Sequence, residues 1–151
     1  MNPKKWGPTF WRLLHIVALF IIIGSRNIKH VIAALTLILP CAFCRASFRQ
    51  FQRIYPLEDY LGLEYGFLLW VCTAHNWVNR KQGKPVVSFT DCLISYGSEV
   101  TPSSADELSR AVADAGVFLF EHYPTIGKGN PNPPDEVRAV TNAYHKFFSS
   151  L

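Results

Sequence analysis

The sequence predicts an all-α protein, a bundle of about four helices with additional C-terminal helices. Apolar residues recur at helical spacing within segments that proline and glycine bound. No segment shows the alternating pattern of a convincing run of strands. A chain of 151 residues with 49% apolar content is sufficient for one packed core. We therefore expect a single helical domain built as a bundle.

Prolines and glycines set the expected limits of the first four helices. A proline suits the first turn of the first helix, and prolines end the second and third helices. A loop with two glycines then precedes the fourth. The expected bounds are, in chain order, Pro8 to about Ile23, 28–39, Pro40 to about Tyr55, and Phe67 to about Gln82.

The last third of the chain contains a further pair of helical patterns. The segment 86–102 reads as irregular, because serine, aspartate and glycine interrupt it. Ser104 to Glu107 has the form of a capping box, and an apolar stripe continues from it to about Tyr123. The last helix is expected to begin at Pro134, where acidic residues follow in the first turn.

Charge and composition restrict the functional class. The net charge of +4 comes from basic residues spread along the chain, without the dense stripe or the motif of a nucleic-acid-binding protein. Charged residues amount to 17%, below the roughly 25% of typical soluble proteins. The low charge predicts apolar surface that an oligomer interface would cover. We expect no nucleic-acid partner.

Two apolar runs, 13–23 and 31–39, raise the question of a membrane segment. Spanning a bilayer takes about 20 apolar residues, so neither run predicts a membrane span. A signal peptide is the closer alternative for the first run, since Lys4 and Lys5 precede it. The tryptophans, arginine and histidine between residues 6 and 15 argue against that alternative. Buried helices account better for both runs.

Cys41 and Cys44 form a C-x-x-C motif directly after Pro40. At a helix start, unpaired backbone N–H groups and the positive end of the helix dipole are expected to lower the pKa of the first thiol, Cys41. The spacing also lets the two sulfurs close and reopen a disulfide. Structural cysteines and metal knuckles use the same motif, so a Cys3His zinc site with Cys72 and His75 or Cys92 remains an alternative.

Two further groups of residues suggest a ligand site. Cys72, His75, Asn76 and Asn79 share one helical face beside Trp70. Singly, each fits a structural residue with satisfied hydrogen bonds; together they fit a polar ligand with a flat ring system. At the N-terminus, Gly7 permits close backbone approach. Trp11 and His15 share a face there, which is also typical of a core stripe with a buried histidine.

Taken in order, these motifs resemble the Erv/ALR family of FAD-linked sulfhydryl oxidases. The family pattern places a glycine four residues before a tryptophan and eight before a histidine, as in Gly7, Trp11 and His15. Its Pro-Cys-x-x-Cys is present, and its Trp-x-Cys-x-x-His-Asn-x-Val-Asn-Arg-Lys-x-Gly-Lys-Pro matches 70–85. A further cysteine follows at Cys92. The likeness covers about residues 6 to 92 and predicts a core of 1–92 with a helical extension of 93–151.

The resemblance implies an enzyme that forms disulfide bonds. Cys41 would exchange disulfides with a thiol-containing substrate, and Cys44 would lie next to the flavin. Electrons would pass from the Cys41–Cys44 pair to FAD and then to O2, giving H2O2. Cys72 and Cys92 would form a structural disulfide. We expect ten cofactor-binding residues, some from the family match and some from the patterns above. They are Gly7, Trp11, His15, Cys44, Trp70, His75, Asn76, Asn79, Lys81 and Lys84.

The sequence departs from the family pattern at several positions, and one departure affects which partners we expect. Leu39 replaces an aromatic residue often found before the Pro-Cys, and Gln82 replaces a leucine. No cysteine remains for the extra shuttle disulfide of many cellular members, so we expect direct oxidation of a client, a separate relay protein, or a cysteine pair borrowed from elsewhere. The start near residue 6 resembles the minimal members of large DNA viruses. The resemblance also implies a homodimer through the first helix. A zinc-stabilised binding module and a membrane-associated structural protein remain the alternatives.

Overall fold

A computed structural model describes residues 3–20, 28–29, 32–33, 36, 39 and 42–97. These residues form the helices α1 (Pro3–Phe20), α3 (Ala42–Ile54), α4 (Gly66–Lys81) and α5 (Phe89–Gly97). A short 3-10 helix, η1 (Leu57–Asp59), lies between α3 and α4. No strand occurs within the described residues. The predicted all-α fold class is confirmed.

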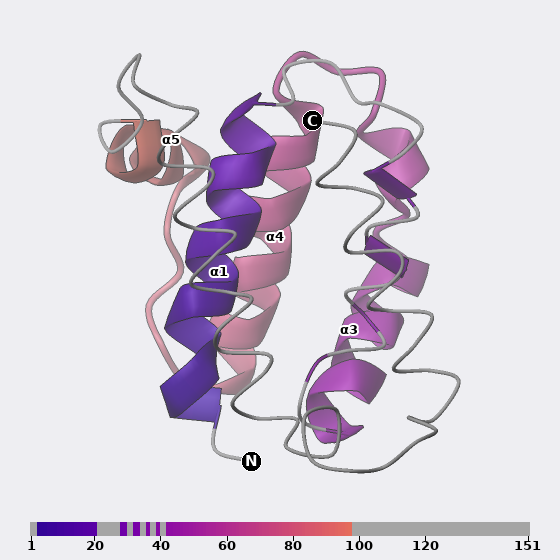
Figure 1. Cartoon of the computed structure of the whole chain (residues 1–151), viewed down its shortest axis with the longest axis vertical. Helices are drawn as coiled ribbons and strands as arrows, with labels where there is room; N and C mark the ends of the chain where they lie inside the picture. The colour runs from indigo at the N-terminus through magenta and orange to yellow at the C-terminus, as the bar shows by residue number, and fades with distance from the viewer. Residues whose placement is uncertain are drawn as a thin grey trace, which may run out of the picture.

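Helix α4 is the centre of the arrangement (Figure 1). α1 packs along one side of α4, and α3 packs on another side. The short α5 contacts both α1 and α4, away from α3. This packing brings Trp11, Cys72 and Cys92 to the same side of the fold. None of the described helices has the combination of length and apolar character that crossing a bilayer requires.

Helix α1 begins earlier than the sequence predicted. Pro3 occupies its first position, and Pro8 lies inside the helix. Pro8 has no backbone N–H to donate to the preceding turn, and it lies at an exposed position of the helix. The second half of the helix is buried on all sides, from residue 13 to residue 18, and supplies much of the core. Ile16 and Ala18 are fully buried, and Leu14 is nearly so.

Aromatic side chains form the interface between α3 and α4. Trp70 has no exposed surface, and its ring packs against those of Phe48 and Phe51. Its indole N–H donates a hydrogen bond of 2.9 Å to the backbone carbonyl of Tyr55, at the end of α3. The buried donor is satisfied and the two helices are linked at this end. Trp70, predicted to contact a cofactor, is placed in the core between α3 and α4.

The helix predicted for residues 28–39 lies only partly within the described residues. Positions 28, 29, 32, 33 and 36 have helical backbone. Ile28, Ile32 and Thr36 are buried and lie four residues apart, so they form one inward face. The side chain of Gln52 on α3 donates a hydrogen bond to the hydroxyl of Thr36. The described positions agree with the helix and the burial that the sequence predicted for this run.

The turn before α4 depends on backbone conformations that few residues adopt. Tyr65 has a left-handed conformation with φ of 54°. A Cβ on the next residue, Gly66, would overlap the backbone carbonyl oxygen of Tyr60. Only glycine fits at position 66. The predicted glycine loop is confirmed here, and α4 begins within one residue of the expected position.

The prediction that 86–102 is irregular is wrong for its central part, which forms α5. The hydroxyl of Ser88 accepts a hydrogen bond from the backbone N–H of Asp91 and donates one to the Asp91 carboxylate. This arrangement is an N-terminal helix cap. Phe89, Cys92 and Tyr96 follow at helical spacing and turn toward the core. The helices predicted over 104–123 and from Pro134 onward lie outside the described residues.

Candidate functional site

Cys44 lies in the first turn of α3, which begins at Ala42 and so two residues after the expected start at Pro40. It is the third residue of the helix and is half-buried. The adjacent Phe43 is exposed over 76% of its surface, which is unusual for an aromatic side chain. Cys41 lies outside the described residues. The position of Cys44 near the positive end of the helix dipole favours its thiolate form.

Aromatic rings from α1, α4 and α5 stack on one another beside the disulfide. The rings of Trp11 and His75 are nearly parallel, with centroids 4.2 Å apart and an interplanar angle of 9°. His15 stacks on Tyr96 at 3.9 Å and 16°. His15 and His75 are tilted to each other, with centroids 5.4 Å apart. We call Trp11, His15, His75 and Tyr96 the ring cluster.

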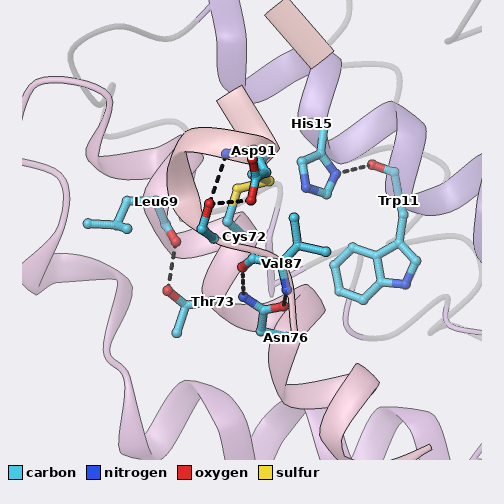
Figure 2. Close-up of a disulfide and its surroundings, with 10 residues drawn as sticks. Trp11, His15, Leu69, Cys72, Thr73, Asn76, Val87 and Asp91 are labelled. Atoms are coloured by element: carbon cyan, nitrogen blue, oxygen red, sulfur yellow. Dashed lines mark hydrogen bonds between the residues drawn. A yellow bond between two sulfur atoms is a disulfide. The ribbon is translucent and has the colours of Figure 1, made fainter. Parts of the chain in front are cut away.

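Burial keeps both histidines of the ring cluster neutral. The His15 side chain has no exposed surface. Its Nδ1 lies 2.7 Å from the backbone carbonyl oxygen of Trp11 (Figure 2). Because a carbonyl only accepts, Nδ1 carries the proton and Nε2 holds a lone pair. Burial lowers the pKa of His15 to about 4, and burial together with the charge of Lys84 lowers the pKa of His75 to about 4.

Asn76 fixes the segment between α4 and α5 (Figure 2). Its side-chain amide donates to the carbonyl of Val87 at 2.7 Å, and its carbonyl oxygen accepts from the Val87 N–H at 3.0 Å. These two hydrogen bonds resemble the pair that joins two residues on neighbouring β-strands. Asn76 therefore positions the chain that leads into α5, and Asn79, which is buried one turn later, lies on the same face.

Two predicted lysines have different surroundings. Lys81 donates hydrogen bonds to Ser47 and Gln50 of α3, and its ammonium lies 4.5 Å from the ring centre of Trp77. It therefore links α4 to α3. Lys84 is exposed and close enough to His75 to lower its pKa. Of the two, Lys84 is the cation beside the ring cluster.

A disulfide joins Cys72 of α4 to Cys92 of α5 (Figure 2). The bridge that the family resemblance implied is therefore present. Zinc binds thiolates, and disulfide sulfurs are not thiolates. The zinc-stabilised module considered from the sequence, which needed Cys72, is contradicted by this bond. The bridge fastens α5 against the ring cluster and so holds Tyr96 over His15.

Comparison with known proteins identifies the family. The model of the Erv1/Alr family matches residues 8–97, more than half of the chain. The chain belongs to the Erv1/Alr family. It is 33% identical to the "FAD-linked sulfhydryl oxidase" of African swine fever virus (isolate Pig/Kenya/KEN-50/1950) over 101 residues, which are 63% of this chain and 82% of that protein.

Two other relatives extend the comparison of this Erv1/Alr member. It is 27% identical over 108 residues to a protein of Acanthamoeba polyphaga mimivirus named "Probable FAD-linked sulfhydryl oxidase R368", covering 68% of this chain and 76% of that one. It is 29% identical over 91 residues to "FAD-linked sulfhydryl oxidase ERV1" of Oryza sativa subsp. japonica, covering 57% and 46%. No solved structure matches the chain.

The Erv1/Alr fold brings some of the predicted site residues together and separates others. Trp11, His15, His75 and the disulfide form one neighbourhood, whereas Trp70 packs into the core on the α3 side. Gly7 is buried, and a Cβ there would meet no atom of the described residues within 4 Å, so these residues leave space beside it. Sequence reasoning missed Tyr96. Its spacing of four residues from Cys92 and seven from Phe89 was the available signal.

Proposed function

We propose that this protein is a FAD-dependent thiol oxidase that forms disulfide bonds in thiol-containing proteins. The observation that carries the proposal is the Erv1/Alr match over residues 8–97, which includes both redox cysteines. The relatives named above carry the words "FAD-linked sulfhydryl oxidase". The position of Cys44 in the first turn of α3 supports the proposal.

The residues near the ring cluster fit FAD. A flat ring system needs flat partners, and Trp11 and His75 are both half-buried, so part of each remains accessible. The open space beside Gly7 leaves room for a ligand next to the α1 backbone. Lys84 is an exposed cation beside His75 and suits a pyrophosphate. We propose Trp11, His75, Lys84 and Gly7 as cofactor-binding residues. His15 would support Trp11 through its hydrogen bond to the Trp11 backbone carbonyl. Asn76 and Asn79 would position the same face of α4.

The chain's own chemistry is a thiol–disulfide exchange. A substrate thiolate attacks Cys41 of the Cys41–Cys44 disulfide, and Cys44 leaves as a thiolate. The helix start favours that thiolate, which makes Cys44 a good leaving group. A second substrate thiolate then displaces Cys41, which releases the oxidised substrate and leaves the dithiol. A bound FAD would supply the acceptor for two electrons and their transfer to O2, so that two thiols and O2 become one disulfide and H2O2.

Variants of the redox pair test this function. We expect purified protein to hold FAD and to consume O2 when a dithiol is supplied. Cys44→Ser should abolish O2 consumption and keep the cofactor bound, because it removes a sulfur and changes little in volume. Cys41→Ser should also lose turnover. Full oxidase activity in Cys44→Ser would contradict the assigned electron path, and a chain that holds no flavin at saturating FAD would contradict the function.

We also propose that the protein works as a homodimer and passes disulfides directly to a client or to a separate relay protein. The low charge content and exposed apolar side chains such as Ile54, Leu63 and Ile94 support an interface. The family resemblance implied a dimer through the first helix, but Ile16, Val17 and Ala18 of α1 are buried within the chain itself. Light scattering after gel filtration should give twice the monomer mass of 17.1 kDa, and a monomer would contradict the dimer.

A further inference from the structure

Three potential metal ligands from three helices meet at the Cys72–Cys92 disulfide. A ring nitrogen of His15 on α1 and the two sulfurs all lie within 4.8 Å of one another. All three residues are buried; Cys72 is 3% exposed and Cys92 is 5% exposed. The same sulfurs are covalently joined in the oxidised protein. The fold thus holds an imidazole beside two sulfurs, which form a disulfide here and would become two thiols on reduction.

The His15 ring is oriented as a metal ligand would be. Its Nδ1–H donates to the carbonyl of Trp11, so the lone pair is on Nε2. Nε2 is buried and has no hydrogen-bond partner among the described residues. Figure 2 shows the ring turned so that this nitrogen faces Cys72. A backbone carbonyl on the far nitrogen is the usual outer partner of a zinc-bound histidine. A buried acceptor without a partner is costly, and a metal ion would satisfy it.

We propose that reduction of the Cys72–Cys92 disulfide converts this cluster into a Zn²⁺ site with His15 Nε2, Cys72 Sγ and Cys92 Sγ as ligands. A phosphine reductant and water open the bridge, giving the phosphine oxide and two thiols. Zn²⁺ then displaces the two thiol protons and forms two Zn–S bonds and one Zn–N bond. One coordination position is left for water. This ligand set differs from the sequence-based zinc module, which lacked His15 and included Cys41 and Cys44.

Distances and ligand chemistry favour zinc over other divalent ions. Thiolate and imidazole together suit Zn²⁺, whereas Mg²⁺ and Ca²⁺ prefer oxygen. Zn–S bonds of about 2.3 Å in a tetrahedron place two sulfurs about 3.8 Å apart. A disulfide holds its sulfurs about 2.05 Å apart, so after reduction the two sulfurs must separate by about 1.7 Å, which rotation about the side-chain bonds supplies. The His15 nitrogen already lies within 4.8 Å of both sulfurs. Two thiolates also neutralise the ion in a buried place.

The site would keep the same three helices together in both redox conditions. The disulfide links only α4 and α5, while the zinc ion would also attach α1 through His15. In reducing surroundings, where the disulfide opens, the ion would hold α5 in place. The inference does not depend on oxidase activity, because none of its ligands belongs to the redox pair.

Metal binding by a variant without the redox cysteines tests the proposal. In the full chain carrying Cys41→Ser and Cys44→Ser, Cys72 and Cys92 are the remaining two of four cysteines. FAD-saturated protein is reduced with a phosphine under argon, mixed with ZnCl2 and desalted. We expect one zinc per chain after reduction and none before it. Circular dichroism should show helix content retained, or regained on addition of zinc.

Two ligand variants and one matched control complete the test. His15→Gln and Cys92→Ser, each added to that background, should weaken Zn²⁺ binding more than about tenfold, measured by competition with a chromophoric chelator. Thr90→Ala, an exposed change on α5, alters no proposed ligand and should bind Zn²⁺ like the parent. Equal binding by oxidised protein, no binding by reduced protein, unchanged affinity in His15→Gln, or an unfolded reduced chain that zinc does not refold would each overturn the proposal.

Discussion

Trp70 shows how much one side chain contributes to the α3–α4 interface. Its indole N–H satisfies the carbonyl of Tyr55, and its ring is fully buried. We expect Trp70→Phe to lower the free energy of unfolding by about 2 kcal/mol, because the carbonyl loses its donor and a gap remains. Urea unfolding followed by circular dichroism measures the change. Trp77→Phe is the control; it is half-buried and should cost less. Equal losses in both variants would contradict this account.

The two neutral histidines predict a dependence of stability on pH. Their folded-state pKa values of about 4 lie below the ordinary 6.5. As the pH falls below 6.5, the unfolded chain binds protons that the folded chain does not, so stability is lost between about pH 6.5 and 4 and is constant just above this window. Each site contributes at most about 1.4 kcal/mol per pH unit.

Replacing one histidine isolates its contribution. His15→Gln should flatten the dependence of the urea midpoint on pH between 6.5 and 4.5, since glutamine does not titrate. His75→Gln should flatten it less, because His75 is half-buried and water screens its charge. A wild-type midpoint that does not change over this range would contradict the neutral state of both rings.

At the scale of elements, α5 depends on its cap. Ser88 accepts from the N–H of Asp91, and the helix has only nine residues, so it gains little from helix propensity alone. We expect Ser88→Ala to destabilise α5 by about 1 kcal/mol. Hydrogen exchange of the α5 amides should become faster by about fivefold. Thr90→Ala, an exposed change in the same first turn, should leave the exchange unaltered. Equal acceleration in both would argue against the cap.

Local sequence signals predicted the helices that have strong breakers. Pro56 and the glycines before α4 gave limits within one or two residues. α5 was missed because Ser88, Asp91 and Ser95 look like loop residues, although Ser88-x-x-Asp91 is itself a cap pattern. The start of α1 was missed because Pro8 suggested a beginning. Pro8 instead lies inside the helix at an exposed position, one turn after the start at Pro3, so it did not mark the boundary.

The sequence predicted which residues gather at the site better than it predicted which contacts each of them makes. The motifs placed Trp11, His15 and His75 in one site, and the structure brings their rings together. Spacing along one helix did not reveal that Trp70 faces α3, or that Asn76 binds the backbone of Val87. Both facts depend on contacts between segments far apart in the sequence. Helical periodicity shows which residues share a face of one helix, but it does not show which other helix packs against that face.

At the scale of the whole molecule, the disulfide limits the unfolded chain. It closes a loop between residues 20 positions apart. We expect the double variant Cys72→Ala, Cys92→Ala to lose about 3 kcal/mol of unfolding free energy. Differential scanning calorimetry with a chelator present measures the loss. Wild-type protein reduced by a phosphine under the same conditions should show a similar decrease. An unchanged midpoint in the double variant would mean that helix packing alone holds α5.

The face-to-face stack of Trp11 on His75 joins the two helices on which the rest of the fold is built. A protonated imidazole quenches indole emission far more strongly than a neutral one. With a His75 pKa of about 4, emission from Trp11 should stay bright through mild acid and dim only near that value. Below that pH, separation of α1 from α4 would abolish the quenching and restore the emission. In acid the molecule thus contains its own fluorescent indicator of whether these two helices are docked.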